Sequence, residues 1–367
     1  MRFHFPNYKK NIINVSATFN EMLGNKSDVP KLKVLEKYLK KDYKNVVFII
    51  LDGFGIHPIK TNLDKNNFLR KNIKQTLTSV FPSTTTNATT TLMSGDYPFN
   101  HGWIGWSIYF NELDRAVEIY MARDYYTGEK IDPEFAKNRL PYSAYYNKNK
   151  NYEVNTVFPT YVKIGAAKNN YYYQSNKEMF EAIKECCNKD GKQFIYSYNG
   201  EPDYTMHDNG VNSEKAKSIT LELSDYIEEL HKTLKDTLIV VTADHGHIDI
   251  GGYIEIYKNK ELMDCLAKPM YLEPRATAFK IKENMKEEFK KIFNKSYKKD
   301  FKLFEVDYLV KKGVFGPLNE KNRDLIGDYI AVCKSDKQFV FSENSNRFKG
   351  HHTSLTKEML VPLIIIE

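Results

Sequence analysis

Short apolar runs alternate with amphipathic segments along this chain. Residues 46–51 (VVFIIL), 194–198 (FIYSY) and 238–242 (LIVVT) are rich in β-branched or aromatic side chains, which is typical of buried strands. A further run, 361–366 (VPLIII), could complete the same sheet. Before the first run, residues 31–44 place three leucines on one helical face. Between the second and third runs, apolar residues recur at helical spacing, at Ile219, Leu223, Tyr226, Ile227, Leu230 and Leu234.

Strands that alternate with helices predict an α/β fold, with a mostly parallel central sheet and helices on both faces. Two stretches break the alternation, the tyrosine-rich residues 107–175 and the lysine-rich residues 253–345. The sequence contains no Pro/Gly/Ser-rich linker and no repeat of 20–50 residues. We therefore expect a single catalytic domain over residues 1–367, with 107–175 and 253–345 as inserted cap segments.

The amino-acid composition and charge exclude several classes of protein. Hydrophobic residues make up 41% of the 367 residues and aromatic residues 14%, which is enough for a large core and excludes a disordered chain. The apolar runs are too short to cross a bilayer, and the first residues lack the apolar segment of a secretory signal, so we expect a cytoplasmic protein without membrane contact. The net charge of +7 favours anionic partners only mildly, so no stable nucleic-acid complex is expected. The four cysteines form no C-x-x-C motif, and we expect them to be reduced and buried.

Acids and histidines follow the predicted strands. Asp52 comes directly after the first strand, Asp203 shortly after the second, and Asp244-His245 after the third; His207 lies four residues after Asp203, and Gly350-His351-His352 lies near the end of the chain. Because the carboxyl ends of parallel strands meet at one edge of a sheet, these side chains can converge. Carboxylates mixed with imidazoles suit a pair of divalent ions such as zinc, whereas carboxylates alone would suit magnesium better. The alternative is that each acid serves as a turn or cap residue, but four separate motifs favour a metal site.

A threonine-rich segment, FPSTTTNATTTLMSG at 81–95, is the remaining candidate. Threonine favours helix N-caps, so the segment predicts the start of a helix. A hydroxyl at that position also lies where backbone N–H groups and the helix dipole attract a phosphate. A nearby metal would lower the pKa of such a hydroxyl and make it a nucleophile.

Together these motifs resemble the alkaline phosphatase superfamily, and most closely its type I phosphodiesterase / nucleotide pyrophosphatase branch. The resemblance rests on five segments in the family's order, IILDGFG (49–55), FPSTTTNATTTLMSG (81–95), EPDYTMHDNG (201–210), TADHGH (242–247) and GHHTSL (350–355). It implies one metal ion held by Asp203, His207 and His352, and a second held by Asp52, Asp244, His245 and the nucleophile. His352 is preferred to His351 because the segment resembles G-x-H.

The resemblance also implies a mechanism. The spacing from Pro82 to Gly95 places the nucleophile at Thr85, with Thr84 and Thr86 as alternatives because the run is degenerate. Thr85 would attack a phosphorus atom in line, form a phospho-threonine, and be released by water. We expect two divalent ions, zinc or manganese, and a small phosphate ester as partner, with phosphodiester or pyrophosphate bonds of nucleotide-like substrates as the bonds cleaved.

The chain departs from the family near the phosphate. Trp106 stands where phosphodiesterases of this branch often have an asparagine that donates to a phosphate oxygen, and Thr86-Asn87 replaces a common Phe-Pro pair. Asn87 or a backbone amide could substitute as the donor. Trp103 and Trp106 could stack on a base or sugar, although packing is the more usual role of tryptophan.

Several alternative functions stay open. A monoester dianion usually requires an additional cation such as arginine, and none lies between Arg70 and Arg115, although Arg115, Arg123 or Arg275 could approach from elsewhere. This favours a diester or pyrophosphate over a phosphomonoesterase. Phosphonate hydrolysis is compatible with the same residues. A catalytically inactive metal- or phosphate-binding protein is the alternative from another class.

Overall fold

The computed structural model describes residues 1–149, 151–162 and 165–367. Its central sheet has seven strands within the described residues, in the order β2-β18-β9-β1-β8-β6-β7. Their bounds are β1 (Asn45–Leu51), β2 (Ile73–Thr78), β6 (Glu153–Pro159), β7 (Asn169–Tyr173), β8 (Gln193–Asn199), β9 (Thr237–Thr242) and β18 (Leu360–Ile366). Neighbours β9, β1, β8, β6 and β7 are parallel, and β18 is antiparallel to both β9 and β2. The predicted α/β class with a mostly parallel sheet is therefore confirmed.

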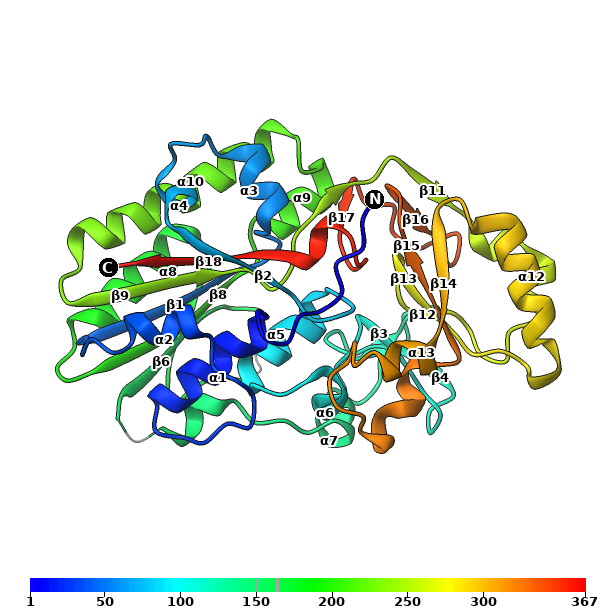
Figure 1. The fold of residues 1–367 in the computed structure, drawn as a ribbon, viewed down its shortest axis with the longest axis horizontal. Helices are drawn as coiled ribbons and strands as arrows, with labels where there is room; N and C mark the ends of the chain where they lie inside the picture. The colour runs from blue at the N-terminus through cyan, green and yellow to red at the C-terminus, as the bar shows by residue number, and fades with distance from the viewer. Residues whose placement is uncertain (150, 163–164) are drawn as a thin grey trace.

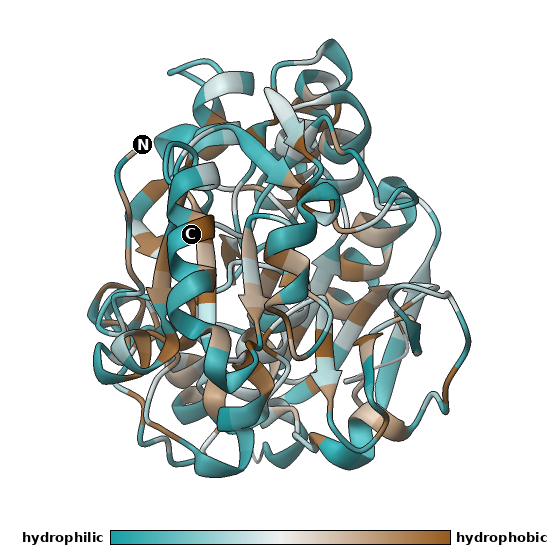
Figure 2. Ribbon diagram, turned by 90° about the vertical axis from the view of Figure 1, so that its right-hand side faces the viewer, coloured by the Kyte–Doolittle hydropathy of each residue, from teal (hydrophilic) through white to brown (hydrophobic). Residues whose placement is uncertain are grey.

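Helices cover both faces of this sheet (Figure 1). One layer contains α3 (Ile56–Asn62), α4 (Phe68–Lys71), α8 (Asn176–Asn188), α9 (Asp203–Asn209) and α10 (Glu214–Thr233), with α10 contacting each of the others. The other layer contains α1 (Ile12–Met22), α2 (Lys33–Tyr38) and α5 (Thr85–Ser94). The central strands are almost continuously buried, as expected for parallel strands covered on both faces. Figure 2 shows hydrophobic residues concentrated on the inner strands and hydrophilic residues on the outward helices.

A second, antiparallel sheet lies beside the first, on the right of Figure 1. Its order is β14-β15-β13-β12-β3-β4-β5. The bounds are β3 (Ser107–Phe110), β4 (Arg115–Glu118), β5 (Arg123–Asp124), β12 (Tyr271–Glu273), β13 (Ala276–Phe279), β14 (Phe301–Glu305) and β15 (Tyr329–Cys333). The segment 107–175 thus divides between two sheets, because β3, β4 and β5 join the second sheet whereas β6 and β7 belong to the central one.

Smaller elements complete the second unit and the connections. Two-stranded ladders join β10 (Ile248–Asp249) to β17 (Gly350–His351) and β11 (Gly252–Ile254) to β16 (Lys337–Phe339). The remaining helices are α6 (Pro98–His101), α7 (Phe135–Arg139), α11 (Lys260–Asp264), α12 (Lys286–Tyr297) and α13 (Val306–Lys311). In the described part of the chain, none of the helices combines the length and apolarity that crossing a bilayer requires. All four cysteines are free and buried, as the sequence predicts.

Candidate metal centre and phosphate site

The strand-end acids meet at one edge of the central sheet. Asp52 follows β1, Asp203 begins α9 just after β8, and Asp244 and His245 follow β9. Because β9, β1 and β8 are adjacent and parallel, these three connections lie side by side. An ideal Cβ on Gly55 would lie only 2.4 Å from the Cα atom of Gly246, so glycine is required where the loops after β1 and β9 touch.

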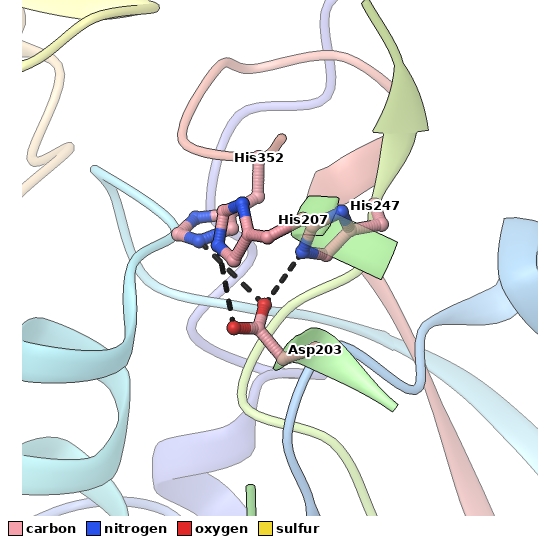
Figure 3. Close-up of side chains that lie close together, drawn as sticks. All are labelled: Asp203, His207, His247 and His352. Atoms are coloured by element: carbon pink, nitrogen blue, oxygen red, sulfur yellow. Dashed lines mark hydrogen bonds and ion pairs between the residues drawn. The ribbon is translucent and has the colours of Figure 1, made fainter. Parts of the chain in front are cut away.

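Asp203 lies at the centre of one group of side chains (Figure 3). Its carboxylate lies 3.3 Å from His207 Nε2, 3.8 Å from His352 Nε2 and 2.5 Å from His247 Nε2. His207 comes from the same helical turn, whereas His352 follows β17. Asp203 and the three histidines offer ligand atoms within 4.8 Å of one another. The structure therefore brings together the three residues predicted for one ion and adds His247.

His245 lies at the centre of a second group. Its Nε2 atom lies 3.1 Å from Asp52 Oδ1, 3.4 Å from Asp244 Oδ2 and 3.3 Å from Thr85 Oγ1. The Thr85 hydroxyl also lies 3.4 Å from Asp52 Oδ2. The four side chains predicted for the second ion are thus neighbours, and Asp203 Oδ1, at 4.0 Å from His245 Nε2, joins the two groups.

The histidines are oriented as metal ligands usually are. The Nδ1 atoms of His207, His245 and His352 lie 2.9–3.1 Å from the backbone oxygens of Gly350, Gly246 and Ser83, respectively. A backbone acceptor of this kind keeps the proton on Nδ1 and leaves Nε2 with a free lone pair. His247 differs, because its Nδ1 has no partner among the described residues and its Nε2 faces Asp203. This geometry makes His247 a hydrogen-bond partner of Asp203.

The site concentrates buried negative charge. Burial and the carboxylate of Asp203 raise the pKa of Asp52, and burial together with Asp52 raises the pKa of Asp244 well above its usual value. Burial alone would raise the pKa of Asp203 too, but His207 and His247 hold it well below the usual range. Burial alone would lower the pKa of His245, yet Asp244 and Asp52 raise it to about 10. In the absence of another cation, these buried acids depend on protons and on hydrogen-bond donors such as the Tyr198 hydroxyl and the Gly53 amide.

A divalent cation fits this donor set. Asp244 Oδ2 is buried and has no hydrogen-bond partner among the described residues, although an isolated buried carboxylate oxygen is costly. Oxygen and imidazole nitrogen donors together suit zinc or a similar transition metal. The two groups could hold one ion each, with the acid-rich group around Asp52 and the histidine-rich group around Asp203.

The threonine-rich segment forms the predicted helix, and Thr85 is the first residue of α5. Thr85 is partly exposed, whereas Thr84 and Thr86 are buried. The described contacts with the acid and histidine cluster come from Thr85. Among the three candidates, Thr85 is therefore the hydroxyl placed at the cluster.

The two residues predicted to contact the substrate, Asn87 and Trp106, form hydrogen bonds within the protein. Asn87 is fully buried and its Nδ2 donates to the backbone oxygen of Pro82 at 2.9 Å, which fixes the turn before α5. Trp106 is partly exposed, and its Nε1 donates to Glu118 at 3.0 Å. Trp103 is buried and donates to the backbone of Leu140, so packing accounts for it.

Three neighbours of the site were missed by sequence reasoning. His247 stands in the same TADHGH segment, two residues after His245, and that spacing was its only signal. Tyr198 donates its phenolic proton to Asp52 Oδ2. Glu273, at the end of β12, contacts Thr84 and accepts a hydrogen bond from the Trp106 amide. The last two lie far from their partners in sequence and carry no motif.

Comparison with protein-family models gives a match over most of the chain. The family model of type I phosphodiesterase / nucleotide pyrophosphatase matches residues 46–355. No curated protein sequence matches the chain closely enough to count as a relative.

Solved structures resemble the fold at low sequence identity. Murine ectonucleotide pyrophosphatase/phosphodiesterase 5 is similar with a TM-score of 0.62 and 19% identity, over 88% of this chain and 87% of that chain. An inactive threonine-to-alanine variant of the murine protein, in complex with AMP, gives 0.61 and 17%, over 89% and 88%. Phosphonoacetate hydrolase from Sinorhizobium meliloti 1021, in complex with phosphonoformate, gives 0.62 and 17%, over 87% and 89%. Because the family model covers most of the chain, this protein belongs to the type I phosphodiesterase / nucleotide pyrophosphatase family.

Proposed function

We propose that this protein is a metal-dependent hydrolase of phosphodiester or pyrophosphate bonds in small, nucleotide-like substrates, with Thr85 as its nucleophile. The observation that carries the proposal is the position of the Thr85 hydroxyl, at the start of α5 and 3.3–3.4 Å from His245 Nε2 and Asp52 Oδ2. A hydroxyl placed among metal-ligating groups, and at a helix N-terminus, suits attack on a phosphate, because a bound metal would lower its pKa.

Two ions, zinc or manganese, would be held by Asp203, His207 and His352 and by Asp52, Asp244, His245 and Thr85. When bound, they would lower the pKa of the Thr85 hydroxyl and stabilise charge on the entering and leaving oxygens. Thr85 Oγ1 loses its proton to solvent and attacks phosphorus as the bond to the leaving oxygen breaks, which gives a phospho-threonine, and the leaving oxygen takes a proton from solvent. Water then attacks the same phosphorus and gives up a proton, the bond to Thr85 breaks, Thr85 Oγ1 takes up a proton, and the phosphate product leaves. The backbone N–H groups at the start of α5 stabilise the phosphoryl oxygens throughout.

The arginines of the chain support a diester over a monoester dianion. Arg115 pairs with Glu129 at 2.8 Å, Arg123 pairs with Glu118, and Arg275 is fully buried against Glu358 at 2.9 Å. The three arginines that could have approached the site are therefore already paired with carboxylates. The second negative charge of a monoester would have no arginine partner from this group.

A cavity beside Asp203 could hold the organic group attached to the phosphate. It has a volume of about 230 Å³ at the carboxyl ends of β6, β7 and β8, and Tyr161, Tyr173, Tyr204 and Glu201 are among its lining residues. Aromatic walls favour a flat or apolar group. Phosphonate hydrolysis is the second candidate function, because a phosphonoacetate hydrolase has a similar fold.

The test is a substrate panel with the zinc- or manganese-loaded protein. We expect bis-p-nitrophenyl phosphate to be turned over faster than p-nitrophenyl phosphate, with no turnover of p-nitrophenyl sulfate or phosphonoacetate. ATP, NAD and dinucleotides would then identify the nucleotide class. Thr85→Ala should reduce kcat at least a thousandfold, while Thr86→Ala, the matched control one residue away, should leave measurable activity. Robust turnover by Thr85→Ala would exclude Thr85 as nucleophile, and no turnover by the metal-loaded wild type would favour a binding protein.

A further inference from the structure

The first residue before α5 does not cap its own helix. Thr84 occupies the N-cap position with extended backbone angles (φ −131°, ψ 152°), but its side chain makes no capping hydrogen bond. A threonine there ordinarily accepts a hydrogen bond from the amide of the second or third helical residue. The Thr84 hydroxyl instead lies beside the carboxylate of Glu273, where it lowers the pKa of that carboxyl. The amides of the first turn, next to Thr85, are thus left without their usual partner.

Glu273 reaches this position from the second sheet. It ends β12, is 2% exposed, and its Oε1 accepts a hydrogen bond from the Trp106 amide at 2.8 Å. The pairing of Leu272 with Ser107 between β12 and β3 places Glu273 and Trp106 together. A buried carboxylate requires such donors, and the hydroxyl of Thr84 is one of them.

We propose that Glu273 is a positioning residue, which holds the Thr84 hydroxyl away from the N-terminus of α5 and so keeps those amides available for a phosphate oxygen of the substrate. The inference rests on the proposed function. Without the Glu273 carboxylate, the Thr84 side chain can rotate and accept hydrogen bonds from the amides of the first turn of α5. Those amides are then no longer free to bind a phosphate oxygen.

The charge of Glu273 does not argue against an anion nearby. Burial raises the pKa of Glu273 to about 7, although the Thr84 hydroxyl and the Trp106 amide stabilise the charged form. The neutral form of the carboxyl is therefore favoured more than it would be in water. Its repulsion of a phosphate is correspondingly reduced.

Calorimetric titration of the zinc-loaded protein with inorganic phosphate tests the proposal without any substrate. Glu273→Ala should raise the Kd for phosphate about fivefold to tenfold, the effect expected for the loss of one hydrogen bond to an anion. Thr84→Ala alone should change the Kd less than about twofold, because it removes the competing hydroxyl. The double variant should return to the value of Thr84→Ala. Glu273→Gln, which still accepts from the Trp106 amide and can bond the Thr84 hydroxyl, should resemble the wild type.

Two controls keep the outcome interpretable. Zinc content and the thermal midpoint are measured for each variant, and Glu273→Leu, of similar volume, replaces the alanine variant if that variant does not fold. An unchanged Kd in Glu273→Ala would overturn the role of Glu273 while leaving the proposed function intact. Equal weakening in the single and double variants would show that Glu273 does not act through Thr84. Failure of the wild type to bind phosphate would overturn both proposals.

Discussion

At the scale of single residues, Asp52 is fixed from behind by a tyrosine. Tyr198 is buried on β8 and donates its phenolic proton to Asp52 Oδ2, while Asp52 Oδ1 faces His245. Hydrogen bonds to a ligating carboxylate hold it in the orientation that the metal needs, and their loss costs metal affinity. We therefore expect Tyr198→Phe to weaken the ion on the Asp52 side about tenfold, measured by competition with a chromogenic chelator.

Tyr173→Phe is the matched control for this substitution. The Tyr173 hydroxyl donates to the backbone oxygen of Tyr198 at 2.8 Å, so its removal takes one phenol from the same region without touching a predicted ligand. Its metal affinity should stay within about twofold of the wild type. Equal losses in both variants would mean that Tyr198 acts through packing and not through Asp52.

At the scale of elements, local sequence patterns predicted the central strands and the long helix. The buried runs at 46–51, 194–198 and 238–242 are the cores of β1, β8 and β9, and the apolar stripe from Ile219 lies on α10. Parallel strands bring their carboxyl ends to one edge of the sheet, so Asp52, Asp203 and Asp244 were expected to lie close together because each follows a predicted strand. The second sheet could not be predicted, because its pairing of Leu272 with Ser107 joins residues 165 positions apart and leaves no local period. Glu273 was missed for the same reason.

A buried ion pair also links the second sheet to the loop after β9, which contains Asp244 and His245. Arg275 and Glu358 are both fully buried, with Arg275 Nη2 2.9 Å from Glu358 Oε1, and the Gly246 amide donates to the Glu358 backbone oxygen at 2.7 Å. Removing one partner of such a pair leaves an uncompensated buried charge. Arg275→Leu should therefore lower the free energy of unfolding by about 3–5 kcal/mol.

Urea unfolding of Arg275→Leu and of the double variant Arg275→Leu/Glu358→Leu measures this cost. The double variant should recover part of the loss, since neither charge is then left alone, although the carbonyls of Lys337 and Ser335 lose their donor. If the double variant is less stable than Arg275→Leu, the loss of stability comes from packing and not from the unpaired Glu358 carboxylate.

At the scale of the whole molecule, the site lies where the central sheet meets the second sheet. Asp52, Asp203 and Asp244 come from the ends of the central sheet, whereas Glu273 and Trp106 come from strands of the second sheet or their flanks. His352 comes from the chain between the second sheet and the last strand of the first. The buried acids at this junction repel one another unless cations neutralise them. Metal binding is therefore expected to contribute to the stability of the entire fold.

Metal binding should also change how stability depends on pH. In the metal-free protein His245 has a pKa of about 10, against 6.5 in an unfolded chain. Between these values His245 holds a proton in the folded protein that it lacks in the unfolded chain, so the stabilisation from His245 that is complete below pH 6.5 is lost as pH rises toward 10. We expect the free energy of unfolding in chelator to fall by about 1.4 kcal/mol per pH unit from pH 7 to 9.

A zinc ion bound at His245 would replace that proton, and affinity for the metal would increase as pH rises. Urea unfolding at pH 7, 8 and 9, in chelator and in excess zinc, should therefore give a falling profile in the first series and a flat or rising one in the second. His245→Asn in chelator is the control, because it removes the His245 proton and should reduce the slope to the part that comes from the raised pKa of Asp244. A flat profile for the metal-free wild type would show that the Asp52 and Asp244 carboxylates do not hold a proton on His245, and the cluster would then be less electronegative than its geometry indicates.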